Sequence, residues 1–352
     1  MNDEIGLAWA VTLAKQADPK DTWKNPRVGA IIVDHNGQVL GQGYHHRYGD
    51  RHAEVDALAQ VEPGTDLKSA TLYVSLEPCC QQGKVGPCTT AVIEAGIGRV
   101  VIGSLDPNPA VNGRGVAILQ ATGVEVDVQG ADDNRQALLN PAFVYYHKTG
   151  KPYVQLKLAE SGDWRVAAKQ GQQTKITDQV ADQAIHVLRG RQSAILIGSE
   201  TALVDQPALT VRSVKIDHDQ PLRVILDRRG RLYKQVAAGQ WATRTLIYSQ
   251  NKDFVRDFDQ VQEWSGDLQE LLIDLGQRGC QSLLVEGGPT IIKAFLKDQD
   301  WQSFDLYQTE SRFGSNGVQG LSPATIVAAG GQLKETKVVG NAIDFHFERE
   351  VH

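Results

Sequence analysis

Four side chains that can bind or assist a metal are confined to two short segments of the sequence. His52 and Glu54 stand in the first segment, and Cys79 and Cys88 stand in the second. Zinc prefers thiolate and imidazole ligands, and a site with three protein ligands keeps a fourth position for a water whose pKa the metal lowers. We therefore predict that His52, Cys79 and Cys88 bind zinc. Glu54 is predicted to be the catalytic residue that shuttles protons between this water and a leaving amine.

The order of these residues is that of the zinc deaminase signature, but the spacing differs from its simplest version. Eight residues separate Cys79 from Cys88, where that version has two. Cys80 is an alternative ligand, although adjacent residues at a strand end point in opposing directions. Two other interpretations are a structural zinc site, for which no fourth protein ligand is evident nearby, and chance proximity of the thiols with His52 capping a helix.

Composition and charge restrict the class of protein. The 352 residues, 41% of them hydrophobic, suffice for two domains with their own cores. The net charge is −6, and neither half has the basic face that nucleic-acid binding requires. We see no run of apolar residues long enough for a membrane helix and no basic leader, so we expect a cytoplasmic protein that binds neither nucleic acid nor membrane. In that compartment, clustered cysteines favour metal binding over disulfides.

The predicted metal ligands lie at the ends of predicted helices and strands. Hydrophobic spacing indicates a helix from Ile5 to Leu13, and Asn36-Gly37 indicates a hairpin turn between strands at 28–33 and 38–43. His52 would begin a helix, Cys79 would follow a strand, and Cys88 would precede a helix. The further helices and strands expected in this half lie at 53–60, 71–76, 89–95, 100–102, 116–121 and 124–126.

A polar segment at 147–152, with a glycine and a proline, is the expected domain boundary. We therefore predict a deaminase domain at 1–148 and a second domain at 149–352. In the second domain the alternation of strands and helices begins again, which favours two α/β domains over one. Its expected elements are a helix at 178–189 and strands at 153–158, 194–197, 222–226, 245–248 and 282–285.

Across nearly its whole length, the sequence resembles the bifunctional deaminase/reductase family of riboflavin biosynthesis. In the first half the resemblance rests on Asn25-Pro26-x-Val28-Gly29-Ala30, Gly41-x-Gly43-Tyr44-His45, His52-Ala53-Glu54-Val55, Leu72-Tyr73-Val74-x-Leu76-Glu77-Pro78-Cys79, Gly86-Pro87-Cys88 and Asp106-Pro107-Asn108-Pro109. In the second half it rests on Lys157-Leu158-Ala159-x-Ser161-x-Asp163, the segment from Ile197 to Arg212, Pro221-Leu222-Arg223 and Val285-Glu286-Gly287-Gly288-Pro289-Thr290.

The resemblance implies an α/β fold, with an N-terminal cytidine-deaminase-like three-layer α/β/α domain and a C-terminal dihydrofolate-reductase-like α/β domain. The first domain would use zinc to deaminate 2,5-diamino-6-(5-phosphoribosylamino)pyrimidin-4-one hydrolytically. The second would use NADPH to reduce the ribosyl chain to ribityl. The alternative is a deaminase whose reductase domain is weakened or inactive. Assembly as a homo-oligomer is also implied.

The same resemblance assigns roles to residues outside the zinc site. In the deaminase, Asn25 and His45 would hold the pyrimidine or ribose, and Lys84 would face the phosphate. In the reductase, the cofactor would contact Ala159, Thr201 and Asp205. The sugar phosphate would be bound by Arg189, Leu209, Arg212 and Glu286, since the planar guanidinium suits phosphate. The chain departs from the family pattern at several positions, among them Gln81, Gln173, Lys175, Glu200 and Gln206.

Overall fold

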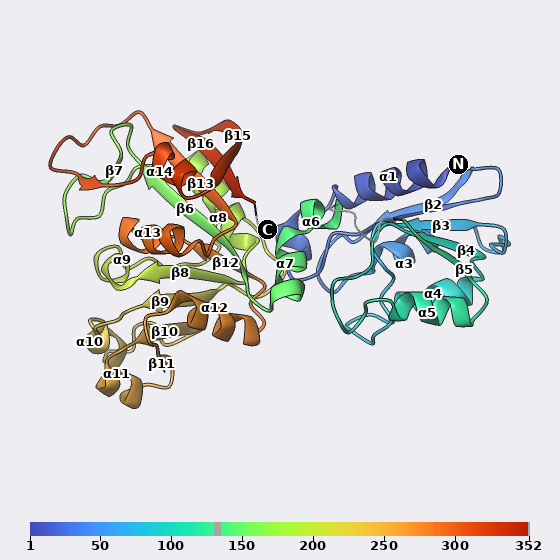
Figure 1. Cartoon of the computed structure of the whole chain (residues 1–352), viewed down its shortest axis with the longest axis horizontal. Helices are drawn as coiled ribbons and strands as arrows, with labels where there is room; N and C mark the ends of the chain where they lie inside the picture. Colours follow the sequence, from blue (N-terminus) through green and yellow to red (C-terminus); the bar gives the residue numbers. More distant parts are fainter. Residues whose placement is uncertain (130–134, 351–352) are drawn as a thin grey trace. The chain divides into compact units, whose positions relative to one another are not determined.

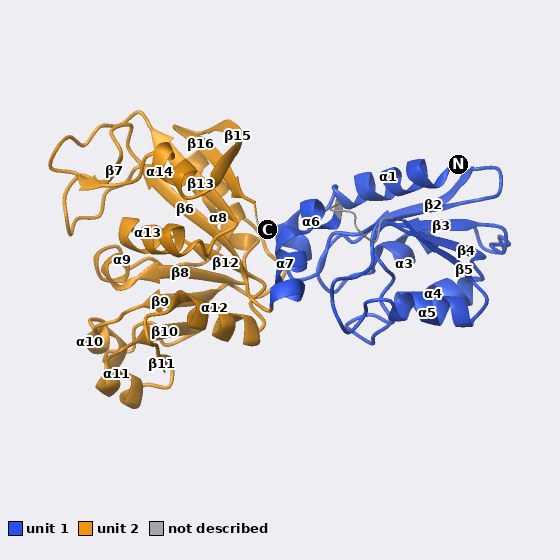
Figure 2. Cartoon of the chain, in the orientation of Figure 1, with its two compact units in different colours: residues 1–149 blue, residues 150–352 orange. Residues whose placement is uncertain are grey.

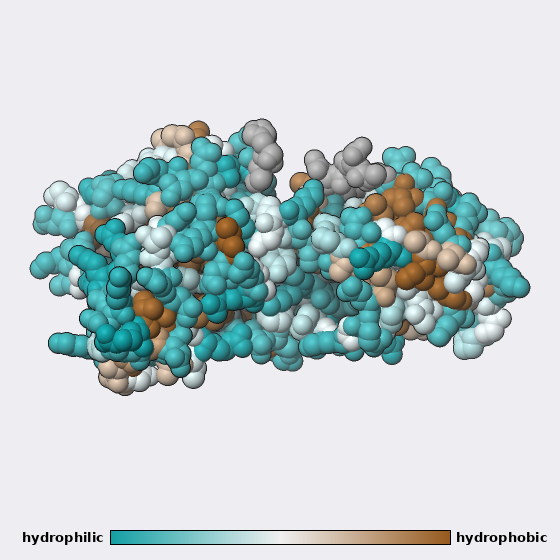
Figure 3. All heavy atoms as spheres, turned by 60° about the horizontal axis from the view of Figure 1, so that its bottom comes forward, coloured by the Kyte–Doolittle hydropathy of each residue, from teal (hydrophilic) through white to brown (hydrophobic). Residues whose placement is uncertain are grey.

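The computed structural model describes residues 1–129 and 135–350, which form two compact units, residues 1–149 and 150–352 (Figure 2). The division falls within the polar segment 147–152. Most of the surface seen in Figure 3 is hydrophilic. Within the described ranges, no helix has the length and apolar character needed to span a membrane.

Unit 1 is built on a five-stranded sheet with the order β2-β1-β3-β4-β5. β1 pairs antiparallel with β2 and with β3, whereas β3, β4 and β5 run parallel. The expected hairpin joins β1 to β2, and its Gly37 has a φ of 83°, in the left-handed region that favours glycine. The strands are β1 (Gly29–Val33), β2 (Val39–Tyr44), β3 (Thr71–Val74), β4 (Arg99–Ile102) and β5 (Glu125–Val128).

Helices cover both faces of this sheet and make unit 1 a three-layer α/β/α structure (Figure 1). On one face, Leu7 and Leu13 of α1 (Asp3–Ala14) pack with Ile31 and Tyr73. On the other face, the strands pack against α3 (Ala53–Leu58), α4 (Cys88–Ala95) and α5 (Arg114–Ala121). Burial on both faces explains why all five residues of β1 are hydrophobic or small. The remaining helices of unit 1 are α2 (Pro19–Thr22), α6 (Arg135–Leu139) and α7 (Pro141–Thr149).

Unit 2 contains a nine-stranded sheet with the order β11-β10-β9-β8-β12-β6-β13-β16-β15. The first seven of these strands run parallel, and β13, β16 and β15 pair antiparallel in turn. The strands are β6 (Tyr153–Glu160), β8 (Ala194–Gly198), β9 (Leu222–Leu226), β10 (Thr245–Ser249), β11 (Val261–Glu263), β12 (Ser282–Val285), β13 (Ser303–Thr309), β15 (Gly331–Val339) and β16 (Ala342–Arg349). A separate two-stranded ribbon pairs β7 (Arg165–Ala167) with β14 (Val318–Gln319).

Two hydrophobic clusters hold helices against the two faces of this larger sheet. One face packs against α12 (Leu268–Gln277), α13 (Pro289–Asp298) and α14 (Pro323–Ala328). The other face packs against α8 (Gln179–Gly190), α9 (Ser199–Val204), α10 (Tyr233–Ala237) and α11 (Lys252–Asp257). Because β9, β8, β12 and β6 are parallel neighbours, their carboxyl ends meet at one edge, where ligands of open α/β sheets bind.

Candidate active sites

The structure brings His52, Cys79 and Cys88 of unit 1 together. The His52 Nδ1 atom lies 3.2 Å from the Cys88 Sγ atom and 3.5 Å from the Cys79 Sγ atom. All three possible ligand atoms lie within 4.8 Å of one another. A tetrahedral zinc with usual bond lengths separates a nitrogen and a sulfur ligand by roughly 3.6 Å. The three side chains therefore fit zinc.

Two helix starts position His52 and Cys88, and Cys79 lies in the loop between β3 and α4, five residues after the strand ends at Val74. His52 is the N-cap of α3, but its side chain makes no capping hydrogen bond and is directed to the thiols. This argues against the interpretation in which His52 only caps the helix. Cys88 is the first residue of α4, and its backbone N–H donates to the Cys79 sulfur at 3.4 Å. Hydrogen bonds from Cys88 and His52 lower the pKa of Cys79 to about 4, so this sulfur is available as a thiolate ligand.

Glu54 stands beside the three ligands and is buried, with 3% of its surface exposed. Burial, together with the negative charge of Cys79, raises the pKa of Glu54 to about 7. A carboxyl group with a pKa near the working pH can both accept and return a proton. It lines a cavity of about 320 Å³ together with His52 and Cys79.

Asn25 and His45 form one wall of this cavity. The His45 Nδ1 atom lies 3.0 Å from the Arg51 carbonyl oxygen, to which it donates, so the Nε2 atom is left to accept from the Asn25 Nδ2 group at 3.2 Å. Burial lowers the pKa of His45, which favours this neutral form. The amide of Asn25 is thereby fixed in a single orientation at the cavity.

Lys84 lies on the loop between the two cysteines and also lines the cavity. Its Nζ atom lies 4.2 Å from the ring centre of Tyr48, a cation–π contact. Gln81 lines the cavity as well, and its Nε2 group donates to the Ala110 carbonyl at 3.1 Å. The loop thus presents one cation, Lys84, to the cavity. The hydrogen bond of Gln81 links the loop to the segment that follows β4.

A buried carboxylate, Glu77, holds the segment after β4 against the zinc site. It accepts hydrogen bonds from the backbone N–H groups of Asp106, Gly113 and Val116, at 3.1, 3.0 and 3.3 Å. Asp106 lines the cavity in turn, and burial raises its pKa to about 6. The Glu77-Pro78-Cys79 segment therefore supplies a metal ligand, Cys79, and the carboxylate of Glu77, which anchors the segment that carries Asp106.

Unit 2 contains a larger cavity of about 1400 Å³ at the edge where the carboxyl ends of β6, β12, β8 and β9 meet. Arg189 and Glu286 form a paired group inside it. The Arg189 Nε and Nη2 groups donate to the two carboxylate oxygens of Glu286 at 2.6 and 2.8 Å. Burial opposes ionisation of Glu286, but the bonds from Arg189 outweigh burial and keep its pKa below the usual value. Lys157 lines the cavity too, and burial lowers its pKa.

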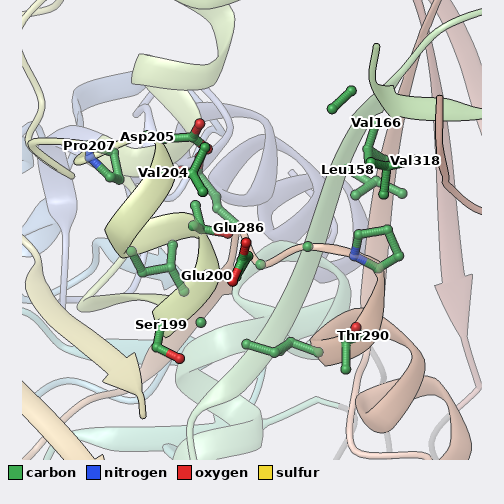
Figure 4. Close-up of a pocket in the computed structure, with 18 of the residues that line it drawn as sticks. Leu158, Val166, Ser199, Glu200, Val204, Asp205, Pro207, Glu286, Thr290 and Val318 are labelled. Atoms are coloured by element: carbon green, nitrogen blue, oxygen red, sulfur yellow. The ribbon is translucent and has the colours of Figure 1, made fainter. Parts of the chain in front are cut away.

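The other predicted reductase residues are distributed around the same cavity. Ala159, Thr201, Asp205 and Leu209 all line it. Figure 4 shows Asp205, Glu200, Ser199, Glu286 and Thr290 around this space. Leu209 is buried with a φ of 50°, a strained conformation for a residue with a side chain. Arg212 does not line the cavity; its guanidinium donates to the Thr210 hydroxyl at 2.9 Å.

The glycine-rich turn after β12 exposes its backbone to the cavity, so the phosphates of a dinucleotide can approach that backbone closely. A Cβ atom on Gly288 would meet no atom within 4 Å, so open space adjoins the backbone there. Gly198 and Gly287 both pack closely on Ile291, which brings the ends of β8 and β12 together. The size of the cavity and its exposed backbone fit NADPH.

Comparisons with known proteins agree with this geometry. A family model described as the cytidine and deoxycytidylate deaminase zinc-binding region matches residues 1–104, and one described as the RibD C-terminal domain matches residues 152–343. The riboflavin biosynthesis protein RibD of Escherichia coli is 39% identical over 316 residues, 84% of each chain. That of Aquifex aeolicus is 38% identical over 303 residues, 84% of this chain and 83% of the relative.

The chain belongs to the RibD family.

Solved RibD structures extend the agreement to the whole chain. RibD of Acinetobacter baumannii superimposes with a TM-score of 0.82 at 32% identity, covering 99% of both chains. A Thermotoga maritima protein described as a diaminohydroxyphosphoribosylaminopyrimidine deaminase/5-amino-6-(5-phosphoribosylamino)uracil reductase gives 0.79 at 31% identity, covering 99% of this chain and 98% of that one. The resemblance read from the sequence is confirmed, as is the fold class of a cytidine-deaminase-like unit followed by a dihydrofolate-reductase-like unit.

Several residues that line the two RibD cavities were not singled out by sequence reasoning. In unit 1 these include Tyr48, Asp106, Asn108 and Phe143. Asp106 and Asn108 belong to the Asp-Pro-Asn-Pro motif, which contributes to the family resemblance but was given no role. Phe143 lies in α7, far along the chain, and no sequence motif marks it as a cavity residue. In unit 2 they include Lys157, Arg228, Arg229 and Arg231. Lys157 has a visible signal, because it is a lysine between two leucines, Leu156 and Leu158, of a strand.

Proposed function

We propose that this chain catalyses two successive steps of riboflavin biosynthesis, with one step in each unit. Unit 1 deaminates 2,5-diamino-6-(5-phosphoribosylamino)pyrimidin-4-one hydrolytically, and unit 2 reduces the ribosyl chain of the product to a ribityl chain. The observation that carries the proposal is that both cavities gather the expected residues, the zinc set in unit 1 and the arginine–glutamate pair in unit 2. Neither the fold of unit 2 nor its family match supports the alternative of a weakened reductase.

In the deaminase, His52, Cys79 and Cys88 hold the zinc, which activates water when bound. Glu54, a buried residue that lines the cavity, holds and returns protons at its carboxylate oxygens. The amide of Asn25, fixed by His45, orients the pyrimidine or ribose. The Lys84 ammonium faces the phosphate, where a positive charge favours the anion.

In the reductase, NADPH supplies a hydride to the ribose-derived carbon when bound. The Arg189–Glu286 pair and Leu209 bind the sugar phosphate, and Ala159, Thr201 and Asp205 contact the cofactor. The support for Arg189 and Glu286 is their burial, with 13% and 8% of their side chains exposed, because a buried ion pair facing a cavity has a fixed geometry. Arg212 keeps its predicted role in phosphate binding only if its guanidinium leaves the Thr210 hydroxyl.

We also propose that the protein works in the cytoplasm and assembles as a homo-oligomer. The −6 charge and the hydrophilic face of Figure 3 support a protein in aqueous solution. Light scattering coupled to size-exclusion chromatography measures the assembly. A mass of one chain at micromolar concentration contradicts it.

The test of the zinc site compares two cysteines, Cys88 and Cys80, as matched variants. Cys88→Ser removes a buried ligand and should abolish both stoichiometric zinc and ammonia release from the diaminopyrimidinone phosphate. Cys80→Ser removes a thiol outside the three-residue group and should preserve both. Zinc content by mass spectrometry and ammonia release are measured on the same samples. Full zinc in Cys88→Ser, or its loss in Cys80→Ser, contradicts the assigned ligand set.

A further inference from the structure

The cavity of unit 1 combines three acids with a single lysine. Glu54, Glu77 and Asp106 line it, and so does Lys84. Among the lining residues that the structure describes, Lys84 is the one lysine or arginine. Its side chain is exposed, and an unrestrained lysine samples many rotamers, so ordering it against a bound phosphate costs conformational entropy. The contacts that hold this side chain therefore decide how well the cavity receives an anion.

Two neighbouring residues hold the Lys84 side chain at the cavity. Its Nζ atom lies 4.2 Å from the ring centre of Tyr48. Its Cδ atom lies beside Gly49, where an added Cβ atom would be only 3.3 Å away. Gly49 has a φ of 89°, in the left-handed region that favours glycine, so this position also leaves room for the lysine stem. Because Tyr48 and Gly49 both line the cavity, they hold the lysine at its wall.

The ring of Tyr48 is itself fixed by the segment around α2. The Trp23 ring packs against it at an interplanar angle of 88°, with 5.0 Å between the ring centroids. The Tyr48 N–H group donates to the Asp21 carbonyl at 2.8 Å. Trp23 is the C-cap of α2 and has a φ of 51°, a conformation that large side chains seldom adopt, and its N–H group donates to the Pro19 carbonyl at 2.8 Å. Backbone hydrogen bonds therefore hold both rings in place.

The same segment carries a residue assigned to the substrate. Asn25 follows Trp23 by two residues, and its N–H group donates to the Thr22 carbonyl at 2.9 Å. Its side-chain amide lines the cavity and is oriented by His45. One short stretch of chain thus positions both the amide proposed to orient the pyrimidine or ribose and the ring that packs against Tyr48.

An ammonium group that lies on an aromatic ring can still bind an anion. Lysine has three N–H donors, and the face of a ring attracts the cation from one side only. The remaining donors are available to phosphate oxygens. Because the ring orders the lysine before the anion arrives, binding does not have to supply that ordering, which strengthens the affinity. An aliphatic side chain in place of the ring would keep apolar bulk but lose this attraction.

We propose that Tyr48 is a positioning residue that selects the phosphorylated substrate, by holding the Lys84 ammonium group where the 5′-phosphate binds. The inference rests on the proposed deaminase function. Tyr48 acts through Lys84 and takes no part in proton transfer at the zinc site. Removal of its ring therefore weakens ligands that carry the phosphate and leaves the chemical step unchanged. A tyrosine that only packed the cavity wall would instead affect ligands with and without a phosphate alike.

Steady-state deamination by the full-length, zinc-loaded protein tests this role. Tyr48→Leu should raise the KM of the diaminopyrimidinone phosphate by roughly fivefold, the effect of a partly exposed cation–π contact, and leave kcat unchanged. Tyr48→Phe keeps the ring face and should hold KM within about twofold of the unchanged protein. The dephosphorylated riboside of the same pyrimidinone, measured as a competitive inhibitor, should bind all three proteins equally.

The matched control is Tyr44→Leu, the same change at another tyrosine of unit 1. The Tyr44 ring stacks on His46, with 3.8 Å between the ring centroids, and does not line the cavity. Neither the KM of the phosphorylated substrate nor the inhibition constant of the riboside should change in this variant.

A double-substitution cycle shows whether Tyr48 acts through the lysine. Lys84→Gln should raise the same KM by about tenfold, because it removes a charge-assisted hydrogen bond to the phosphate. In the Lys84→Gln background, Tyr48→Leu should add nothing further, because the ring then has no ammonium group to hold.

Three results overturn the inference while leaving the deaminase proposal intact. One is an unchanged KM in Tyr48→Leu or in Lys84→Gln. Another is a full additional rise when Tyr48→Leu is combined with Lys84→Gln. The third is an equal weakening of the dephosphorylated riboside, which would show that the ring supports the cavity as a whole. Absence of ammonia release by the unchanged protein would instead overturn the deaminase proposal, and this inference with it.

Discussion

The cavities of the two units differ in size and in how much of the chain each requires. The unit 1 cavity measures about 320 Å³, and its reactive group lies within residues 52–88. The unit 2 cavity measures about 1400 Å³ and is lined by residues from Lys157 to Gln319. The first suits a zinc ion and a pyrimidine with its phosphoribosyl group, whereas the second suits an extended dinucleotide beside a sugar phosphate.

Two buried glutamates, Glu54 in unit 1 and Glu160 in unit 2, also differ, because only Glu54 lines a cavity. Burial raises the pKa of Glu54 and of Glu160 to about 7 in both cases. Glu54 lines a cavity beside the metal ligands, whereas Glu160 is fully buried, lines neither cavity and accepts a hydrogen bond of 3.0 Å from the Leu321 N–H group. A raised pKa therefore marks a catalytic group only where a substrate can reach it.

The largest expected effect comes from Glu54→Gln. This change removes the proton carrier but leaves the three ligands, so deamination should fall by at least about 10³-fold while zinc content stays the same. Reduction of the separately supplied deaminated intermediate should continue at the normal rate. Glu94→Gln on the exposed face of α4 serves as the control. A fully active Glu54→Gln variant contradicts the role of Glu54.

A smaller effect is expected for Glu286→Gln in the other cavity. Loss of the carboxylate leaves the Arg189 charge buried beside Lys157 without its counter-charge. The kcat/KM of the reductase should fall about 100-fold, and the free energy of unfolding of unit 2 should drop by roughly 3 kcal/mol. Ammonia release by unit 1 should be unaffected. Equal losses of both activities would show that the two units do not work independently.

The smallest effect concerns stability and its pH dependence. The pKa of Glu160 rises from 4.5 to about 7 on folding, so its stabilising contribution is full below about pH 4.5 and is lost as the pH rises through 7. Glu160→Gln should therefore raise the free energy of unfolding at pH 8 by roughly 2 kcal/mol and change it little at pH 5. Denaturant titrations at both pH values measure this difference.

Glu310→Gln, which is exposed just after β13, provides the pH-independent control for this prediction. Both catalytic activities should survive Glu160→Gln. A loss of NADPH oxidation would place Glu160 with Glu54 among the functional carboxyl groups, and the distinction between the two residues would fail.

The sequence predicted the deaminase centre well because metal binding restricts residue types. Few arrangements of histidine and cysteine fit zinc, and His52, Cys79 and Cys88 met that requirement before any fold was known. The strands of unit 1 were found near their expected bounds for a similar reason. Strands buried on both faces, such as β1, read as continuous hydrophobic runs.

The far end of unit 2 was not predicted, because its pattern is irregular. Asp305 in β13 and Asp344 in β16 are buried acids at positions where hydrophobic residues would identify a strand. β15 is exposed along nearly its whole length, so it owes its strand conformation to its pairing with β16 rather than to its own sequence. The turn after β9, with Arg228, Arg229 and Arg231, was missed as well, because arginines in a turn resemble an ordinary solvated loop.

Turnover of the diaminopyrimidinone phosphate by the full-length protein, with and without NADPH, tests the central claim most directly. Ammonia should appear in both reactions, since deamination needs only unit 1. The ribityl product should form only with NADPH, with one NADPH oxidised for each product molecule. Ammonia release without any NADPH oxidation would contradict the assignment of unit 2, and the absence of ammonia would contradict the assignment of unit 1.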